Sequence, residues 1–258
     1  MDLGIVFLVC LLAGCGAGLG TGFAGMSAAA VISPMLITFL KIPPYNAVGI
    51  ALASDVLASA VSAFTYGKNK NLDVKNGSIM MVFVLLFTMV GSYVASLVPQ
   101  RTMGNFSVFM TMILGFRFLF KPVMTTKEAM QATTPSKRLA GSVLCGIMIG
   151  FICGFIGAGG GMMMLLVLTS VLGYELKTAV GTSVFIMTFT AFTGAASHFA
   201  IGSDQTNPVV LVLCILFTLV FARIGAFIAN RATTETLNRA TGVILVLLGV
   251  IVLGVNFL

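Results

Sequence analysis

The sequence predicts an all-α polytopic membrane protein of two inverted repeats, each a glycine-broken helical hairpin followed by three transmembrane helices. Composition, self-similarity and loop charge lead to this prediction. Of the 258 residues, 59% are hydrophobic and 8% are charged, and the mean hydropathy is +1.11. A soluble domain carries about 25% charged residues. The composition therefore excludes a soluble globular protein and a disordered one.

The second observation is an internal repeat. A shift of 132 positions places Gly25 on Gly157, and the order of glycine landmarks is shared over most of both halves. After a two-residue insertion in a polar loop, the match continues at the larger shift. Duplicated units of this kind are common in transporters. Other matched positions are Gly14 with Gly146, Ala47-Val48-Gly49 with Ala179-Val180-Gly181, and Gly91 with Gly225.

Each repeat opens with a glycine-rich apolar stretch, at 3–40 and 139–172. We interpret each stretch as two helices that meet at a break and return to the same side, either as short spans or as a re-entrant hairpin. The breaks are expected at 18–22 and 157–161. A spanning helix needs about 20 residues. Six later segments satisfy this length: 45–66, 77–98, 103–120, 178–199, 208–229 and 240–257.

Loop charge predicts the orientation of these segments. Loop 67–76 carries three lysines, whereas its repeat partner 200–207 carries only one acid. Cytoplasmic loops are enriched in Lys and Arg, so 67–76 is expected inside, with the basic loops 117–138 and 230–239. Corresponding loops thus fall on opposite sides, which indicates inverted halves and external termini. The predicted organisation is a first repeat at 1–121, a cytoplasmic linker at 122–138 and a second repeat at 139–258.

The two breaks enter from opposite faces and are expected to meet inside the bundle. A helix that starts near Met162 offers free amides that attract anions, and glycines there let a ligand approach the backbone. The alternative is close helix packing through small residues. In the first half, Ser27 replaces one of these glycines. The candidate substrate-binding residues are Thr21, Gly22, Gly25, Ser27, Gly157, Gly159, Gly160, Gly161, Thr182 and Ser183.

Asp55 is the candidate proton-coupling residue. It lies near the centre of segment 45–66, where a charge costs ~2.5–3.5 kcal/mol on insertion scales. It aligns with Met187, so the acid is present in one half only. Proton coupling and a structural hydrogen bond are both compatible with it. The single histidine, His198, is the other candidate proton carrier, or an interfacial residue. Residues that share the helical face of Asp55 are Ala51, Ser59, Ser62 and Tyr66.

The helices after the breaks begin near Asn46 and Thr178, two residue types that are typical N-caps. The cysteines form no CxxC pair, so we expect no metal, disulfide framework or cofactor. The net charge of +7 is assigned to topology and not to nucleic-acid binding. The expected partners are a small anion and the bilayer, with the oligomeric state open. The five cysteines are Cys10, Cys15, Cys145, Cys153 and Cys214.

The glycine-rich phrase at 154–161, followed by Ala-Val-Gly-Thr-Ser at 179–183 and His-Phe-Ala-Ile-Gly at 198–202, resembles the sulfite exporter TauE/SafE family. Degenerate copies at 22–25 and 47–49 extend the resemblance over nearly the whole chain. The resemblance implies a plasma-membrane (inner-membrane) permease for small sulfur-containing anions such as sulfite or sulfonates, often an exporter, and not an enzyme.

Three other functions compete with this interpretation. A membrane thiol–disulfide electron carrier would use one cysteine from each half. An intramembrane protease would need a second catalytic group beside Asp55, and the sequence places no other acid centrally in a spanning segment. A non-transporting assembly subunit is the third alternative.

Overall fold

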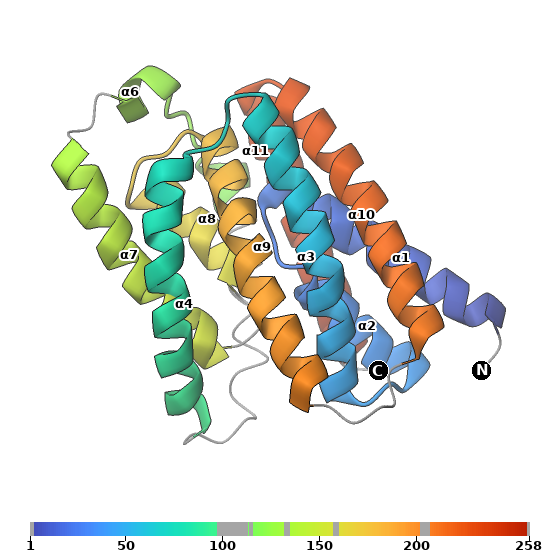
Figure 1. Cartoon of the computed structure of the whole chain (residues 1–258). Helices are drawn as coiled ribbons and strands as arrows, with labels where there is room; N and C mark the ends of the chain where they lie inside the picture. The colour runs from blue at the N-terminus through green and yellow to red at the C-terminus, as the bar shows by residue number, and fades with distance from the viewer. Residues whose placement is uncertain are drawn as a thin grey trace.

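The computed structural model describes residues 3–96, 113, 116–131, 135–156, 160–201 and 207–256 (Figure 1). Every regular element within these ranges is a helix, as the sequence predicted. The helices are α1 (Leu3–Ala24), α2 (Ala29–Leu40), α3 (Pro44–Lys68), α4 (Val74–Ser96), α6 (Lys127–Gln131), α7 (Pro135–Ile156), α8 (Gly160–Ser170), α9 (Leu176–Ile201), α10 (Pro208–Arg231) and α11 (Thr234–Asn256).

In the described part of the chain, 6 helices are long and apolar enough to cross a membrane. Five of them, α3, α4, α9, α10 and α11, correspond to spans predicted from the sequence. The predicted span at 103–120 lies mostly outside the described residues. The sixth candidate is α1, which the sequence analysis treated as half of a broken hairpin. By length and composition, the protein is therefore a multi-pass membrane protein.

The first hairpin breaks later than the sequence predicted. Helix α1 continues through the glycine run at 18–22, and the chain leaves the helix at residues 25–28, which we call the first break. Gly25 has φ +60°. Its amide donates to Thr21 O at 3.0 Å, and the amide of Met26 donates to Gly20 O at 3.3 Å. Glycine typically ends helices in this left-handed conformation. The preceding glycines contact α10 instead.

Those glycines allow α1 to pack closely along α10. A β-carbon at Gly18 or Gly22 would come within 2.6 Å of a backbone oxygen of α10, at Thr218 and Ala222 respectively. The contacts advance in the same direction along both helices, so α1 and α10 are parallel. Small residues permit this approach of two backbones within a membrane. The glycine run is therefore a packing surface and not the point at which the hairpin turns.

Helices α4 and α7 form an equivalent pair. A β-carbon at Gly146 would lie 2.9 Å from Met80 O, and one at Gly150 would lie 2.6 Å from Val84 O. These two helices also run parallel. Each pair joins the opening helix of one predicted repeat to a late helix of the other. This reciprocal exchange is the pattern expected of a duplicated unit, and the inverted orientation of the copies stays our interpretation.

Helices α3 and α9 cross at the centre of the molecule in opposite directions (Figure 1). Gly194 meets Leu52 near one end of the pair, and Gly181 meets Tyr66 near the other. About half of the apolar window of each helix is buried inside the protein, 56% in both cases. These are the most buried of the candidate spans among the described residues. Side chains that face this contact are therefore shielded from lipid.

The N-caps predicted for these two helices are wrong. Helix α3 begins at Pro44, two residues before Asn46, with proline in the first turn, where its missing N–H costs nothing. Helix α9 begins at Leu176. There the buried carboxylate of Glu175 accepts hydrogen bonds from Thr178 N at 3.1 Å and Thr178 Oγ1 at 2.7 Å. The acid performs the capping that the sequence analysis assigned to the threonine.

The three basic loops predicted to be cytoplasmic gather at one end of the molecule (Figure 1). Lys127 Nζ donates to Lys70 O at 3.0 Å, which joins the linker to loop 67–76. Asn238 of α11 accepts from Val123 N at 2.8 Å and donates to Val123 O at 3.0 Å. The linker is therefore docked on both neighbouring loops. This shared location agrees with one cytoplasmic side for all three.

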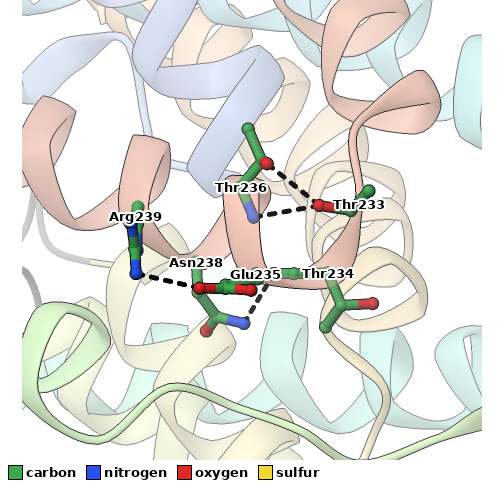
Figure 2. A network of polar contacts seen from close by, with 6 residues as sticks. All are labelled: Thr233, Thr234, Glu235, Thr236, Asn238 and Arg239. Atoms are coloured by element: carbon green, nitrogen blue, oxygen red, sulfur yellow. Dashed lines mark hydrogen bonds and ion pairs between the residues drawn. The ribbon is translucent and has the colours of Figure 1, made fainter.

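Figure 2 shows how α11 begins beside this contact. Thr233 Oγ1 accepts from the amide of Thr236 at 3.3 Å, as an N-cap does. Asn238 Nδ2 donates to Thr234 O at 2.8 Å, and Arg239 pairs with Glu235 at 2.8 Å. The ion pair is well exposed and contributes little to stability. The cap and the buried asparagine are the features that fix this end of the helix.

Candidate anion site

Asp55 is buried, with 1% of its surface exposed. Ser27 Oγ donates to its Oδ2 at 2.6 Å, and Ser59 Oγ donates to its Oδ1 at 2.9 Å. The backbone of Ala28 supplies another hydrogen bond. Because α2 starts at Ala29, the carboxylate lies at the amide end of this helix, where negative charge is stabilised. The carboxylate of α3 is thus the anion that occupies the start of α2.

Met187 occupies the corresponding place in the second half. A β-carbon at Gly161, in the first turn of α8, would collide with the sulfur of Met187. Met187 is the residue that aligns with Asp55 in the repeat. The carboxylate stands at the start of one short helix, and an uncharged thioether stands at the start of the other. The amides at the start of α8 are therefore not matched by an equivalent carboxylate.

The two hairpins meet at these helix starts. A β-carbon at Gly161 would also collide with the carbonyl oxygen of Gly25 and would lie 3.0 Å from Ser27 N. Ser183 Oγ of α9 donates to Gly25 O at 3.3 Å. We call Gly25, Ser27, Gly161, Ser183 and Met187 the junction. All five residues are buried, and four of them were predicted from the sequence as substrate-binding residues.

Three other candidates make contacts within the protein. Gly22 packs on α10, and its carbonyl accepts from Tyr66 Oη at 2.8 Å. Thr21 Oγ1 lies 2.8 Å from Met26 O and 2.9 Å from Ala17 O, to which it donates. Thr182 Oγ1 accepts from the amide of Asp73 at 3.2 Å. The structure therefore places these three in packing or in loop attachment and not at the junction.

The remaining candidates lie at the edge of the described residues or outside them. Gly160 begins α8 and is half-buried, one residue before the junction. Gly157 and Gly159 lie outside the described residues, as does the side chain of His198, although its backbone belongs to α9. Their predicted roles in substrate binding and proton transfer stay predictions.

One polar cluster was not found by sequence reasoning. Asn71 Nδ2 donates to Asn230 Oδ1 at 2.7 Å, and Tyr174 Oη donates to Asp73 Oδ2 at 2.9 Å. Lys177 Nζ donates to Asn230 O at 2.9 Å. We call these five residues the loop-end cluster. It joins the two halves at the end that carries the basic loops. Pairing across 159 positions leaves no periodic signal in a sequence.

The junction contains no charged side chain, and the acid that borders it is Asp55, which accepts from Ser27. Among the described residues, the only charged side chains that are buried are Asp55 and Glu175, and no buried lysine or arginine occurs. Hydrogen-bond donors near the junction are hydroxyls and backbone amides. Such donors bind an oxyanion without adding charge. The site is therefore suited to a solute of low charge.

The fold and the site define a polytopic membrane transporter: a bundle of spanning helices in which two interrupted hairpins meet at a buried polar junction. The chain matches the family model described as sulfite exporter TauE/SafE over residues 10–252. It belongs to this family of membrane transporters, as the motifs at 154–161 and 179–183 had indicated, and it is not an enzyme.

Curated relatives cover nearly the same length. The chain is similar to the probable membrane transporter protein YunE of Bacillus subtilis, with 24% identity over 90% of this chain and 89% of the relative. It is 27% identical to a probable membrane transporter protein of Haemophilus influenzae, over 94% and 96% of the two chains. YdhB of Bacillus subtilis, also a probable membrane transporter protein, is 22% identical over 86% and 90%. No solved structure gives a significant match.

Proposed function

We propose that this transporter exports small sulfur-containing anions, such as sulfite or sulfonates, across the cell membrane by alternating access. The observation that carries the proposal is the asymmetry of the junction. Asp55 fills the amide end of α2 with a carboxylate of the chain itself, whereas Met187 stands at the amide end of α8. A solute anion supplies at α8 the charge that Asp55 supplies at α2.

The strength of this site is modest and suits a carrier. A helix start stabilises an anion by typically 0.3–1 kcal/mol, and by about 2 kcal/mol in favourable buried geometry. The backbone amides in the first turn of α8 are the neutral donors, because the hydroxyl of Ser183 already donates to Gly25 O. Without a buried basic side chain among the described residues, a doubly charged anion lacks compensation. We therefore infer a preference for singly charged oxyanions, which include sulfonates.

Direction follows from the membrane potential. An inside-negative potential drives a monovalent anion outward by ~2.3 kcal/mol per 100 mV. Export of such an anion needs no coupling ion. In alternating access, the loop-end cluster closes the cytoplasmic side and has to open for the anion to enter.

Asp55 supplies a means of proton coupling. Ser27 donates its hydroxyl to Asp55, and its amide nitrogen lies beside Gly161. A bound anion and an ionised Asp55 would then share one residue and repel each other. The groups that bond to Asp55 are neutral, namely two hydroxyls and one backbone amide. Anion binding therefore favours the protonated carboxyl, so for an anion that does not itself titrate, transport depends on pH through this one group.

The proposal is tested in proteoliposomes that contain the purified protein and are loaded with sulfite. An imposed potential, negative inside, should accelerate sulfite efflux, and an opposite potential should slow it. In liposomes loaded with methanesulfonate, which stays singly charged, Asp55→Asn should retain efflux but lose most of its dependence on pH, because the amide does not titrate. Efflux that ignores both the potential and the pH gradient, in wild type and variant alike, would exclude electrogenic and proton-coupled transport together.

The thiol–disulfide alternative receives no comparable support. Cys10 of α1 and Cys214 of α10 hydrogen-bond to each other, one from each half. Both side chains are fully buried in the α1–α10 contact. An external thiol or disulfide has no direct access to them, so this pair is a packing contact.

A further inference from the structure

The hydroxyl of Ser62 has no hydrogen-bond partner within the described structure, although its side chain is fully buried. Two other hydroxyls on α3 bond back to their own helix. Ser54 Oγ donates to Ile50 O at 2.9 Å, and Thr65 Oγ1 donates to Val61 O at 2.7 Å. Leaving a buried hydroxyl unpaired is unfavourable, because the group loses its hydrogen bond to water. Ser62 thus has an unused hydrogen-bond donor, whereas the donors of Ser54 and Thr65 are both used.

The position of Ser62 on α3 shows what it faces. Residues at spacings of three and four lie on one face of a helix, which places Ser62 between Ser59 and Tyr66. Ser59 bonds to Asp55, and Tyr66 bonds to the carbonyl of Gly22. Asp55 in turn accepts from Ser27 of the first break, and Gly22 lies three residues before that break. Helices α3 and α9 run antiparallel, with Tyr66 beside Gly181 and Leu52 beside Gly194, so Ser62 lies on α3 at a level between Ser183 and Met187 of the junction.

We propose that Ser62 is a substrate-binding residue whose hydroxyl donates a hydrogen bond to the transported oxyanion at the junction. The proposal rests on the proposed function, since it assumes that the junction holds an anion. It adds to the amides at the start of α8 a donor from α3, the helix that carries Asp55. The anion would then contact both halves at once. A free donor on a buried helix face is what such an anion requires after it leaves water.

The test compares Ser62→Ala with Ser54→Ala, which removes a hydroxyl of the same helix that is already paired. Anion affinity is measured from the sulfite concentration at half-maximal efflux and from the shift in melting temperature with sulfite or methanesulfonate. Ser62→Ala should weaken affinity about tenfold, the value of a hydrogen bond to a charged group. Ser54→Ala should keep affinity within about twofold, because its partner is its own helix.

If Ser62 had a purely structural role, Ser62→Ala would lower the stability of the anion-free protein. The proposal predicts instead that the anion-free variant is as stable as wild type or more so, and that its anion-induced shift in melting temperature is smaller. Ser62→Cys, which keeps a weaker donor, provides a second variant and should show affinity between wild type and Ser62→Ala.

Two outcomes overturn the proposals separately. Wild-type affinity in both Ser62 variants would refute the role of Ser62 and leave the anion site intact. A wild-type protein that shows neither efflux nor a melting shift with either anion would refute the proposed function itself.

Discussion

At the scale of single residues, Gly25 and Gly173 allow the cost of a left-handed backbone to be distinguished from the cost of a side-chain collision. Gly25 and Gly173 both have φ near +60°. A β-carbon at Gly173 would meet nothing within 4 Å, whereas one at Gly25 would collide with Ser183 Oγ. Alanine at Gly173 therefore introduces only the cost of the left-handed conformation, about 1–2 kcal/mol.

We expect Gly173→Ala to lower the free energy of unfolding by about 1–2 kcal/mol and Gly25→Ala to lower it clearly more. The difference between them reports the contact of Gly25 with Ser183. Denaturant unfolding in detergent micelles, followed by circular dichroism, measures both. Equal losses in the two variants would show that the first break and α9 do not touch in solution.

At the scale of elements, the loop-end cluster links the segment between α3 and α4 to the ends of α9 and α10. The contacts run between neutral or singly charged polar groups, such as Asn71 with Asn230 and Tyr174 with Asp73. Each such hydrogen bond contributes about 1 kcal/mol. In the proposed alternating access, a cluster of this strength keeps one end closed and still allows it to open.

A covalent link across this cluster should stop transport. In a variant without the five native cysteines, Asn71→Cys and Asn230→Cys are joined by a short bifunctional maleimide. We expect efflux of sulfite to fall to background after cross-linking, with no loss of thermal stability, because the closed form is retained. Each single cysteine treated with the same reagent serves as control. Full efflux after complete cross-linking would mean that this end does not open.

The elements themselves were largely predictable. Long apolar runs with proline at their start, as at Pro44 and Pro208, give spans that composition alone identifies. The site of the first break was not predictable from glycine content, because Gly18 and Gly22 serve helix packing, whereas Gly25 takes the left-handed conformation that ends α1. A sequence shows where glycines are, and only the neighbouring helix shows which use each one has.

At the scale of the whole molecule, topology is the prediction to test. Lys70 and Asn207 lie in loops that correspond in the repeat, and both are exposed. Inverted halves require them on opposite sides of the membrane. In the cysteine-free background, Asn207→Cys should react with a membrane-impermeant maleimide on intact cells. Lys70→Cys should react only after permeabilisation. Labelling of both from the same side would contradict the inverted arrangement.

The candidate site was partly predictable at this scale. The repeat aligns Asp55 with Met187 in sequence, and the structure places each residue beside the start of a short helix. The match could not show that Thr182 belongs to a loop attachment or that the hydroxyl of Ser62 is left over. Those properties depend on which side chains from distant segments arrive at the same point, and the spacing of residues along one chain does not encode them.

The exchange of helices between the halves has a consequence for how the protein can be divided. Because α1 packs along α10 and α7 packs along α4, the opening helix of each half packs against the other half. Neither half could fold alone without exposing the glycine-lined helix surface that the other half covers. If the chain were cut within the linker, the two fragments would have to be produced together, because each supplies a helix that covers the other.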